Sequence, residues 1–304
     1  MNDQSKSKNR RRRRPHRPDG KGGGKPQHQR GGKGGGQDQR RGRGGSGGGG
    51  QMLQAKGYWL HGLHAIAEAL LNPKRRIYSL NTTQSGLELL QPHLDAAVAA
   101  KMGRPTPTLM SPPDFNAKIT DAPGHNGIAA DVAPLDQPDL PSLIDKLPDG
   151  AGAALVILDQ VTDPHNIGAI IRSAAAFGAV AVIGQDRHAP DETAIMVKTA
   201  SGGMEHVPYV KVTNIARTLT WLDEHEFLSV GLDERGETTL AKVEMQPRIA
   251  FVMGAEGSGL RRLVSERCQK LVRLPTQPPI ASLNVSNAVA ASLYEWRRLD
   301  EPGA

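Results

Sequence analysis

The stretch Ile249-Ala-Phe-Val-Met-Gly-Ala-Glu-Gly-Ser-Gly-Leu260 decides the fold. It begins with an apolar run of strand character, continues into a glycine-rich turn that carries Glu256, and predicts a helical start at Leu260. This order of strand, turn and helix is typical of the carboxyl end of a strand in an α/β sheet. We therefore expect the carboxylate of Glu256 at such a strand end.

A second stretch, Leu271-Val-Arg-Leu-Pro-Thr-Gln-Pro-Pro-Ile-Ala-Ser-Leu-Asn-Val-Ser286, follows the same logic. Its apolar strand ends at Pro275, because the Pro/Gln loop cannot continue a strand. Polar residues that cap helices then lead into an amphipathic helix predicted over residues 285–298. Open α/β sheets bind ligands at the carboxyl ends of their strands, so both stretches are expected to face one crevice.

The region before them opens with a continuous apolar run over residues 153–158, which is typical of a buried parallel strand. A helix is predicted over residues 167–177, with Asp163 or Asn166 as its cap. Arg172 lies in a helix face that reads as packed on the sheet. A buried arginine needs an anionic partner, so Arg172 is expected to reach a cleft, with a structural salt bridge as the alternative.

The rest of the sequence predicts further strands of this sheet and the helices between them. Apolar runs predict strands, and amphipathic spacing predicts the helices between them. The strands are expected at residues 179–183, 227–231, 249–253 and 271–274, and the helices at residues 191–200 and 214–224. The pattern predicts an α/β domain over residues 151–304, a mostly parallel sheet with helices on both faces.

Residues 52–133 predict a smaller α/β domain, separated from the larger one by a proline-rich linker at 134–150 that contains one helical turn. Helices are expected at 62–71 and 87–100, and strands at 76–82, 106–110 and 127–132. Two segments, residues 74–76 and 125–127, are either RNA contacts or solvated surface. The apolar stripe of Val289, Leu293 and Trp296 on the last helix is either core or an interface between subunits.

Residues 1–51 form an Arg/Gly-rich basic tail. The first 50 residues hold 15 Lys/Arg and three Asp, so they carry +12, whereas the remaining 254 residues carry −5. Because the tail has almost no apolar side chains, it cannot offset the chain entropy lost on folding and is expected to be disordered. It is interpreted either as an electrostatic RNA-binding arm or as a solubilising segment.

Several classes of protein are excluded by missing patterns. The chain has one cysteine, Cys268, so it has no internal disulfide, and we expect a buried thiol and a reducing, cytoplasmic environment. No apolar run approaches the roughly 20 residues of a membrane span, and no signal peptide or cluster of metal ligands is expected. The sequence also lacks a dinucleotide fingerprint, a nucleoside triphosphate loop and an esterase elbow.

Three motifs occur in order along the larger domain. They are Asp163-Pro164-x-Asn166-x-Gly168-x-x-x-Arg172, Met253-Gly254-x-Glu256-Gly257-x-Gly259, and Leu274-Pro275 followed by Ser282-Leu283-Asn284-Val285-Ser286. Together they resemble the motifs of the SpoU (TrmH) family of RNA ribose 2′-O-methyltransferases, in the SPOUT superfamily. The resemblance covers residues 153–298, and the preceding domain is similar to the family's ribosomal-protein-like RNA-binding domain.

This resemblance implies S-adenosyl-L-methionine as cofactor, a trefoil knot near the C-terminus, a homodimer, and 2′-O-methylation of a guanosine in 23S rRNA. By match to the motifs, the backbone at Gly254, Leu274 and Leu283 is expected to hold the cofactor. The implied catalytic and substrate-positioning residues are Asn166, Arg172, Glu256, Ser282 and Asn284.

The chemistry that the resemblance implies needs positioning and control of charge but no metal. A guanidinium stays protonated at neutral pH, so Arg172 is expected to bind the adjacent phosphate rather than act as a base. Two alternatives remain open: methylation of a tRNA ribose, and a non-catalytic RNA-binding or ribosome-assembly factor with the same fold.

Overall fold

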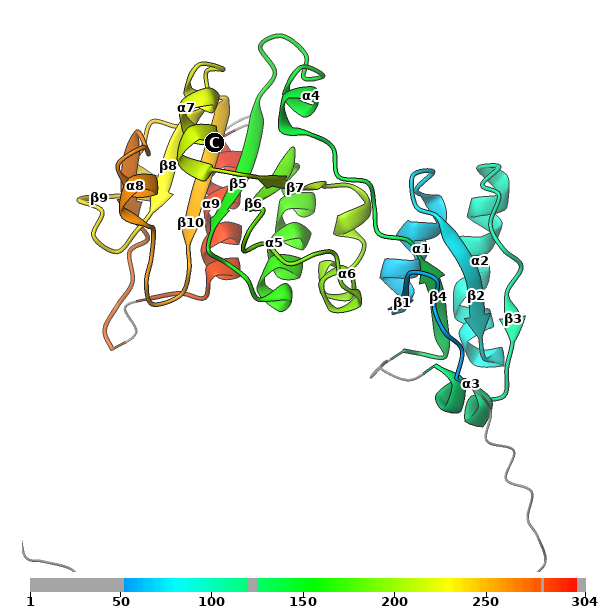
Figure 1. Cartoon of the computed structure of the whole chain (residues 1–304). Helices are drawn as coiled ribbons and strands as arrows, with labels where there is room; N and C mark the ends of the chain where they lie inside the picture. Colours follow the sequence, from blue (N-terminus) through cyan, green and yellow to red (C-terminus); the bar gives the residue numbers. More distant parts are fainter. Residues whose placement is uncertain (1–51, 120–124, 280–281, 300–304) are drawn as a thin grey trace, which may run out of the picture. The chain divides into compact units, whose positions relative to one another are not determined.

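The computed structural model describes residues 52–119, 125–279 and 282–299. The predicted disordered tail, residues 1–51, and the last five residues of the larger predicted domain lie outside the described residues. The described residues form two sheets, one of four strands in the order β1-β4-β2-β3 and one of seven strands in the order β7-β6-β5-β10-β8-β11-β9 (Figure 1).

The first sheet is mixed: β1 and β2 run antiparallel to β4, and β3 runs parallel to β2. Its elements are β1 (Tyr58–His61), α1 (Leu63–Leu71), β2 (Ile77–Thr82), α2 (Gln84–Ala99), β3 (Thr108–Leu109), α3 (Pro112–Lys118) and β4 (Ile128–Val132). The five elements predicted here are confirmed, with bounds that differ by up to three residues. The sequence missed β1 and α3, because four strand residues show no clear alternation and because Pro112-Pro113 resembles a loop.

Those two prolines instead occupy the first turn of α3, where the missing N–H groups cost nothing. Ser111 caps the helix by accepting a hydrogen bond from the backbone N–H of Asp114 at 3.2 Å. A helical turn, α4 (Leu140–Ile144), then lies in the proline-rich segment as predicted, capped by Asp139.

Every strand pair in the second sheet is parallel, which confirms the predicted architecture. The strands are β5 (Ala153–Asp159), β6 (Ala181–Gln185), β7 (Tyr209–Val212), β8 (Leu228–Leu232), β9 (Thr238–Thr239), β10 (Arg248–Gly254) and β11 (Lys270–Arg273). The helices are α5 (Pro164–Ala176), α6 (Ala194–Ala200), η1 (Gly203–Glu205), α7 (Ile215–Asp223), η2 (Leu240–Lys242), α8 (Arg262–Ser265) and α9 (Val285–Arg298). The sequence missed the two short edge strands, β7 and β9.

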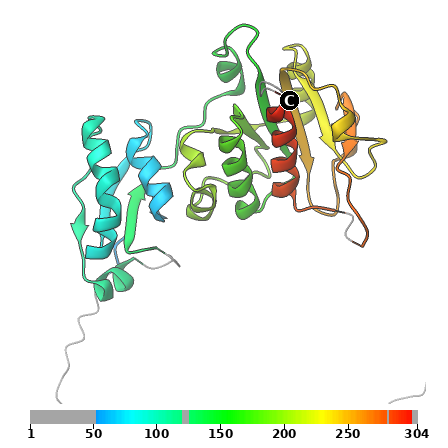
Figure 2. The ribbon, with the colours of Figure 1, turned by 180° about the vertical axis from the view of Figure 1, so that it is seen from behind.

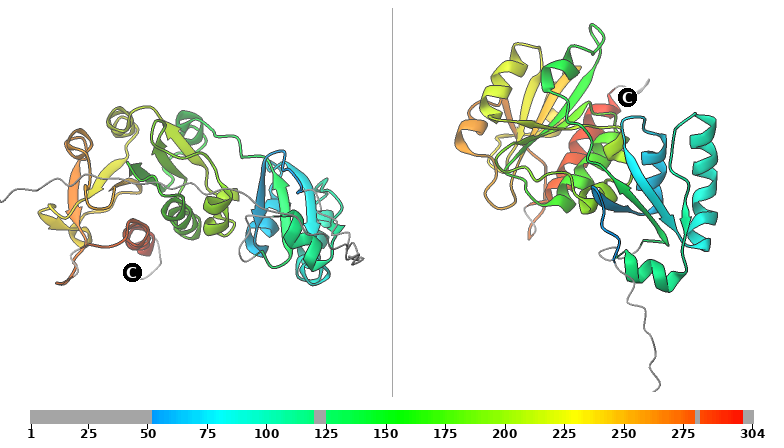
Figure 3. Two further views of the ribbon diagram at one scale, coloured as in Figure 1. Left: turned by 60° about the horizontal axis from the view of Figure 1, so that its bottom comes forward. Right: turned by 45° about the vertical axis from the view of Figure 1, so that its right-hand side comes forward.

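Side chains alternate between the two faces of this sheet, and helices cover both faces. Along β5, Ala154, Val156 and Leu158 join one core cluster, whereas Ala153, Leu155 and Ile157 join the other. Helices α5 and α9 lie side by side on one face and α7 lies on the opposite face (Figures 2 and 3).

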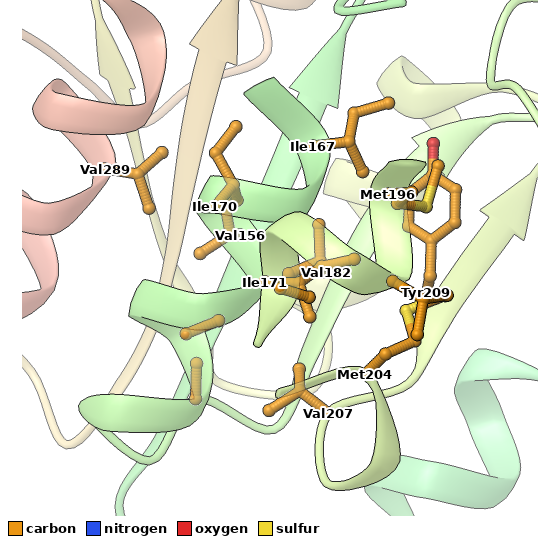
Figure 4. Packing of buried hydrophobic residues seen from close by; sticks show 14 of the residues in the cluster. Val156, Ile167, Ile170, Ile171, Val182, Met196, Met204, Val207, Tyr209 and Val289 are labelled. Carbon is orange, nitrogen blue, oxygen red and sulfur yellow. The ribbon is translucent and has the colours of Figure 1, made fainter. Parts of the chain in front are cut away.

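The core under α5 contains Ile167, Ile170 and Ile171, together with Val289 from α9 (Figure 4). Val289, Leu293 and Trp296 of the predicted stripe are at most 5% exposed, so the stripe is core in this structure. Each such side chain contributes about 1.5–3 kcal/mol by leaving water.

Arg75 corrects one prediction. Residues 74–76 were a candidate RNA contact, but the Arg75 side chain is fully buried between Glu192 and Glu205. Its Nη2 lies 2.7 Å from Glu205 Oε1, and its Nη1 donates to the carbonyl of Ala133 at 2.8 Å. Burial lowers the pKa of Arg75, but the hydrogen bonds that it donates to Glu205 and its attraction to Tyr58, Glu205 and Glu192 together outweigh burial, so the pKa rises. Arg75 is therefore a structural residue.

Cys268 behaves as an unreactive thiol. Its Sγ lies 3.3 Å from the carbonyl oxygen of Val264, and burial raises the pKa of the thiol to about 12. None of the helices in the described part of the chain combines the length and apolar character of a membrane span. Across the same residues, no group of three His, Cys, Asp or Glu side chains gathers in a way that would hold a metal ion.

Gly168 in α5 generates a prediction about stability. A Cβ there would lie 2.5 Å from the backbone oxygen of Met196 and 2.8 Å from Thr199 Cβ, so α5 and α6 must separate. We expect Gly168→Ala to lower the free energy of unfolding by about 1–3 kcal/mol, as overpacking does. Urea unfolding of the purified protein measures this change.

Gly152→Ala is the matched control, because a Cβ there makes only ordinary contacts, the nearest 3.4 Å from the carbonyl of Pro247. It should leave the unfolding midpoint nearly unchanged. Equal midpoints for the two variants would contradict the close approach of α5 to α6.

Candidate functional site

Three polar side chains from distant segments meet beside the carboxyl ends of the central strands. Asn166 lies in the first turn of α5, Glu256 in the loop after β10, and Asn284 at the N-cap of α9. Asn284 Nδ2 donates to Asn166 Oδ1 and to Glu256 Oε1, each at 2.9 Å. Asn166 Nδ2 lies 3.4 Å from the same Glu256 oxygen. One residue from each of the three motifs therefore contributes to a single hydrogen-bonded cluster.

Asn284 can serve this cluster because its two amide ends have different tasks. Its Oδ1 accepts the backbone N–H of Ser286 at 2.8 Å and the hydroxyl of Ser286 at 2.6 Å, which caps α9. Its Nδ2 is left to bond the other two motif residues. The cluster is open to solvent: Glu256 and Asn284 are exposed and Asn166 is half-buried.

The loop that carries Glu256 is tight because glycines permit it. A Cβ on Gly254 would lie 2.1 Å from the backbone of Gly259, which no side chain can tolerate. Gly257 and Gly259 have φ of 80° and 65°, in the left-handed region that favours glycine. The N–H of Gly259 donates to the carbonyl of Ala255 at 2.9 Å and closes the turn. Glu256 thus projects from a compact loop.

A pocket of about 620 Å³ lies against this loop, within the usual range for small-molecule sites. Apolar side chains line part of it: Leu232, Met253, Leu274, Leu283, Val285 and Ala288. Five of the predicted site residues also line it: Gly254, Glu256, Leu274, Ser282 and Leu283. The crevice expected from the two stretches at residues 249–260 and 271–286 is therefore present.

Arg172 belongs to neither the cluster nor the pocket. It is exposed on α5, with its Cα beside Gly203, and within residues 52–119, 125–279 and 282–299 it makes no hydrogen bond or ion pair. The argument that burial forces Arg172 toward a cleft is wrong, because the side chain is not buried. The alternative, a structural salt bridge made by Arg172, is not found among the described residues either.

Sequence reasoning missed Asp233, which lines the pocket with only 5% of its side chain exposed. Arg235 binds both of its carboxylate oxygens, at 2.8 and 2.7 Å. This hydrogen bonding holds the pKa of Asp233 below its usual value, against the opposing effect of burial. The sequence feature that could have identified Asp233 is its position, two residues beyond the end of the strand predicted at residues 227–231.

Fold and site define an α/β protein that binds a small molecule at the carboxyl edge of a parallel sheet. The model of the SpoU rRNA Methylase family matches residues 153–294. The 23S rRNA (guanosine-2′-O-)-methyltransferase RlmB of Coxiella burnetii is 37% identical over 249 residues, covering 81% of this chain and 97% of the relative. This chain belongs to the SpoU family of RNA methylases.

Two further comparisons concern a second relative and the fold. The corresponding RlmB of Escherichia coli K12 is 43% identical over 179 residues, which cover 58% of this chain and 72% of the relative. The crystal structure of the SpoU methyltransferase AviRb from Streptomyces viridochromogenes, in complex with the cofactor AdoMet, shares the fold. It has a TM-score of 0.65 at 24% identity, over 81% of this chain and 91% of that one.

Asn284 allows its capping role to be separated from its role in the cluster. Serine caps helices about as well as asparagine, whereas alanine costs about 1 kcal/mol. We therefore expect Asn284→Ser to retain the unfolding free energy and Asn284→Ala to lose about 1 kcal/mol. Denaturant unfolding of both variants beside the unchanged protein measures the difference. A loss as large for serine as for alanine would show that the amide bonds to Asn166 and Glu256, not the cap, carry the stability.

Proposed function

We propose that this protein transfers a methyl group from S-adenosyl-L-methionine to the 2′-hydroxyl of a guanosine ribose in 23S rRNA. The single observation that carries the proposal is the hydrogen-bonded cluster of Asn166, Glu256 and Asn284 beside the pocket. The names of the RlmB relatives support the substrate, because the Coxiella burnetii relative aligns over 97% of its own length.

The pocket residues fit this cofactor. The apolar side chains of Leu274 and Leu283 suit an adenosine ring, and Gly254 contributes to the pocket wall through its backbone alone. The carboxylates of Asp233 and Glu256 suit a ligand with cationic groups. When bound, the cofactor supplies a methyl group already activated on a sulfonium.

The cluster orients the nucleophile. Both amides bond Glu256 at Oε1, and no described residue donates to Oε2, so that oxygen remains to accept the ribose hydroxyl. Asn166 and Asn284 fix the carboxylate, and Ser282 at the pocket wall adds a hydroxyl that can bond the ribose. Orientation of this kind converts an encounter between two molecules into a step within one complex.

Arg172 lies on the same helix as Asn166 but outside the cluster, and it binds the phosphate next to the target ribose. Its exposure and its lack of a partner among the described side chains support this role, because a free guanidinium is available for a bidentate contact with phosphate. It acts by position and charge, since a guanidinium does not release its proton at neutral pH.

The organisation of the chain follows from this proposal. Residues 52–133 bind the RNA substrate, 134–150 form a linker, 151–304 form the methyltransferase domain, and the basic tail adds electrostatic affinity. The C-terminal segment threads a trefoil knot, and the protein acts in the cytoplasm as a homodimer. The exposed side chains of Tyr294, in α9, and Leu299, directly after it, support a subunit contact on that side.

The test of the function is the transfer of labelled methyl from S-adenosylmethionine to protein-free 23S rRNA and, separately, to bulk tRNA. We expect label on one guanosine of the 23S rRNA, at a 2′-O-methylated position that resists alkali. Label on tRNA alone would overturn the proposed substrate and keep the reaction. Cofactor binding without label on either RNA or on ribosomal particles would favour a non-catalytic factor.

Arg172→Lys tests the role of the guanidinium. Lysine keeps the charge but cannot make the bidentate contact, so we expect a fall in kcat of about 10- to 100-fold with cofactor affinity unchanged. Single-turnover methyl transfer and equilibrium binding of the cofactor give the two quantities.

Arg217→Lys is the matched control, because Arg217 is an exposed arginine on α7, on the opposite face of the sheet. It should leave kcat unchanged. Near-normal turnover of Arg172→Lys with intact RNA affinity would remove Arg172 from the reaction.

A further inference from the structure

Two buried carboxylates flank the strand that carries the Glu256 loop. In the sheet, β10 lies between β5 and β8, and each neighbour presents an aspartate at its carboxyl end. Asp159 pairs with Gly254 in register, and Asp233 directly follows Leu232, which pairs with Met253. Asp159 is fully buried and the side chain of Asp233 is 5% exposed. Both carboxylates therefore stand where the loop leaves the sheet.

Asp159 fastens the far end of that loop. Its Oδ2 accepts the backbone N–H of Arg261 at 2.9 Å, and its Oδ1 accepts Nε of the same residue at 2.7 Å. The guanidinium continues to Gln185 Oε1 at 2.7 Å, so β6 also holds it. A buried carboxylate is costly unless its oxygens are bonded, and here one residue bonds both.

Asp233 stands on the other side of the same loop. Its Oδ2 lies 3.5 Å from the place where a Cβ on Gly259 would stand, so the carboxylate lies against the backbone of the loop. Arg235 holds the carboxylate in place through its backbone N–H at 2.9 Å and its side chain. Asp159 thus bonds the backbone at the end of the loop, and the carboxylate of Asp233 lies against Gly259 on the other side.

We propose that Asp159 and Asp233 are positioning residues that clamp residues 254–261 from both sides and so place Glu256 for the reaction. The inference rests on the proposed function. The need for a clamp follows from the loop itself, because Gly257 and Gly259 give its backbone freedom that a fixed carboxylate cannot tolerate. Asp159 has no place in the pocket wall, so it acts through the loop alone.

Asp159→Asn tests the clamp, because an amide offers one acceptor oxygen to two donors of Arg261. We expect kcat for methyl transfer to fall by about 10- to 100-fold through displacement of Glu256, with a smaller change in KM for the cofactor. In a Glu256→Gln background the same substitution should cost far less, because the group that it positions is already impaired. Equal losses in both backgrounds would overturn the proposal.

Arg261→Lys covers the case in which Asp159→Asn does not fold. Its side chain is 37% exposed, and lysine keeps the charge without the fork that reaches both Asp159 and Gln185. We expect the same non-additive loss with Glu256→Gln, and normal kcat in folded Arg261→Lys would overturn the proposal. Asp191→Asn is the control, since the Asp191 side chain is 94% exposed, pairs with Lys211 outside the site, and should leave kcat unchanged.

Hydrogen exchange separates failure of the clamp from failure of the function, because it needs no turnover. Peptides that cover residues 254–261 should exchange faster in Asp159→Asn and in Arg261→Lys than in the unchanged protein and in Asp191→Asn. Unchanged exchange would overturn the clamp even if methyl transfer were demonstrated. Absence of methyl transfer by the unchanged protein, with faster exchange in the variants, would reject the proposed function and keep the clamp.

Discussion

The parallel pairing of β10 with β5 and β8 is the constraint on which the site depends. Parallel strands have their carboxyl ends at the same edge of the sheet, so strand pairing alone brings the loops after β5 and β10 together. Burial maintains the pairing: β5 is buried along its whole length, and the middle of β10 is buried with it. A slip of one residue would exchange the two faces of β10 and move the Glu256 loop out of line with Asn166.

Local conformation then converts this alignment into a site. Gly254 leaves no room for a side chain, Gly257 and Gly259 adopt left-handed φ, and the cap of α9 turns one asparagine toward the loop. In both the loop and the cap, hydrogen bonds to backbone groups fix the local conformation, and that conformation orients a side chain of the site. Asn284 caps its helix through Oδ1 and reaches Glu256 through Nδ2, so helix formation and site assembly use the same residue.

The sequence predicted what depends on local pattern and missed what depends on strand order. The helix at residues 285–298 was predicted with the observed bounds, and the cluster of Asn166, Glu256 and Asn284 follows from three motifs that each end a strand or begin a helix. The roles of Asp159 and Asp233 depend on β10 lying between β5 and β8, and no local pattern encodes that order. Arg172 was misplaced because periodicity cannot tell a helix face under the sheet from one beside a neighbouring turn.

Charge links the site to its proposed substrate. Residues 51–304 carry a net charge of −5, so this part of the protein does not attract a polyanion as a whole. RNA that reaches the cluster must be held by cations at particular places, which an exposed and unpaired Arg172 and a +12 tail both offer. The carboxylates of Glu256 and Asp233 have a different task at the pocket, because they suit the cationic methyl donor and hold the loop that faces it. Because Arg172 lies outside the pocket, the proposed function has the cationic donor and the RNA phosphate meet different parts of the protein.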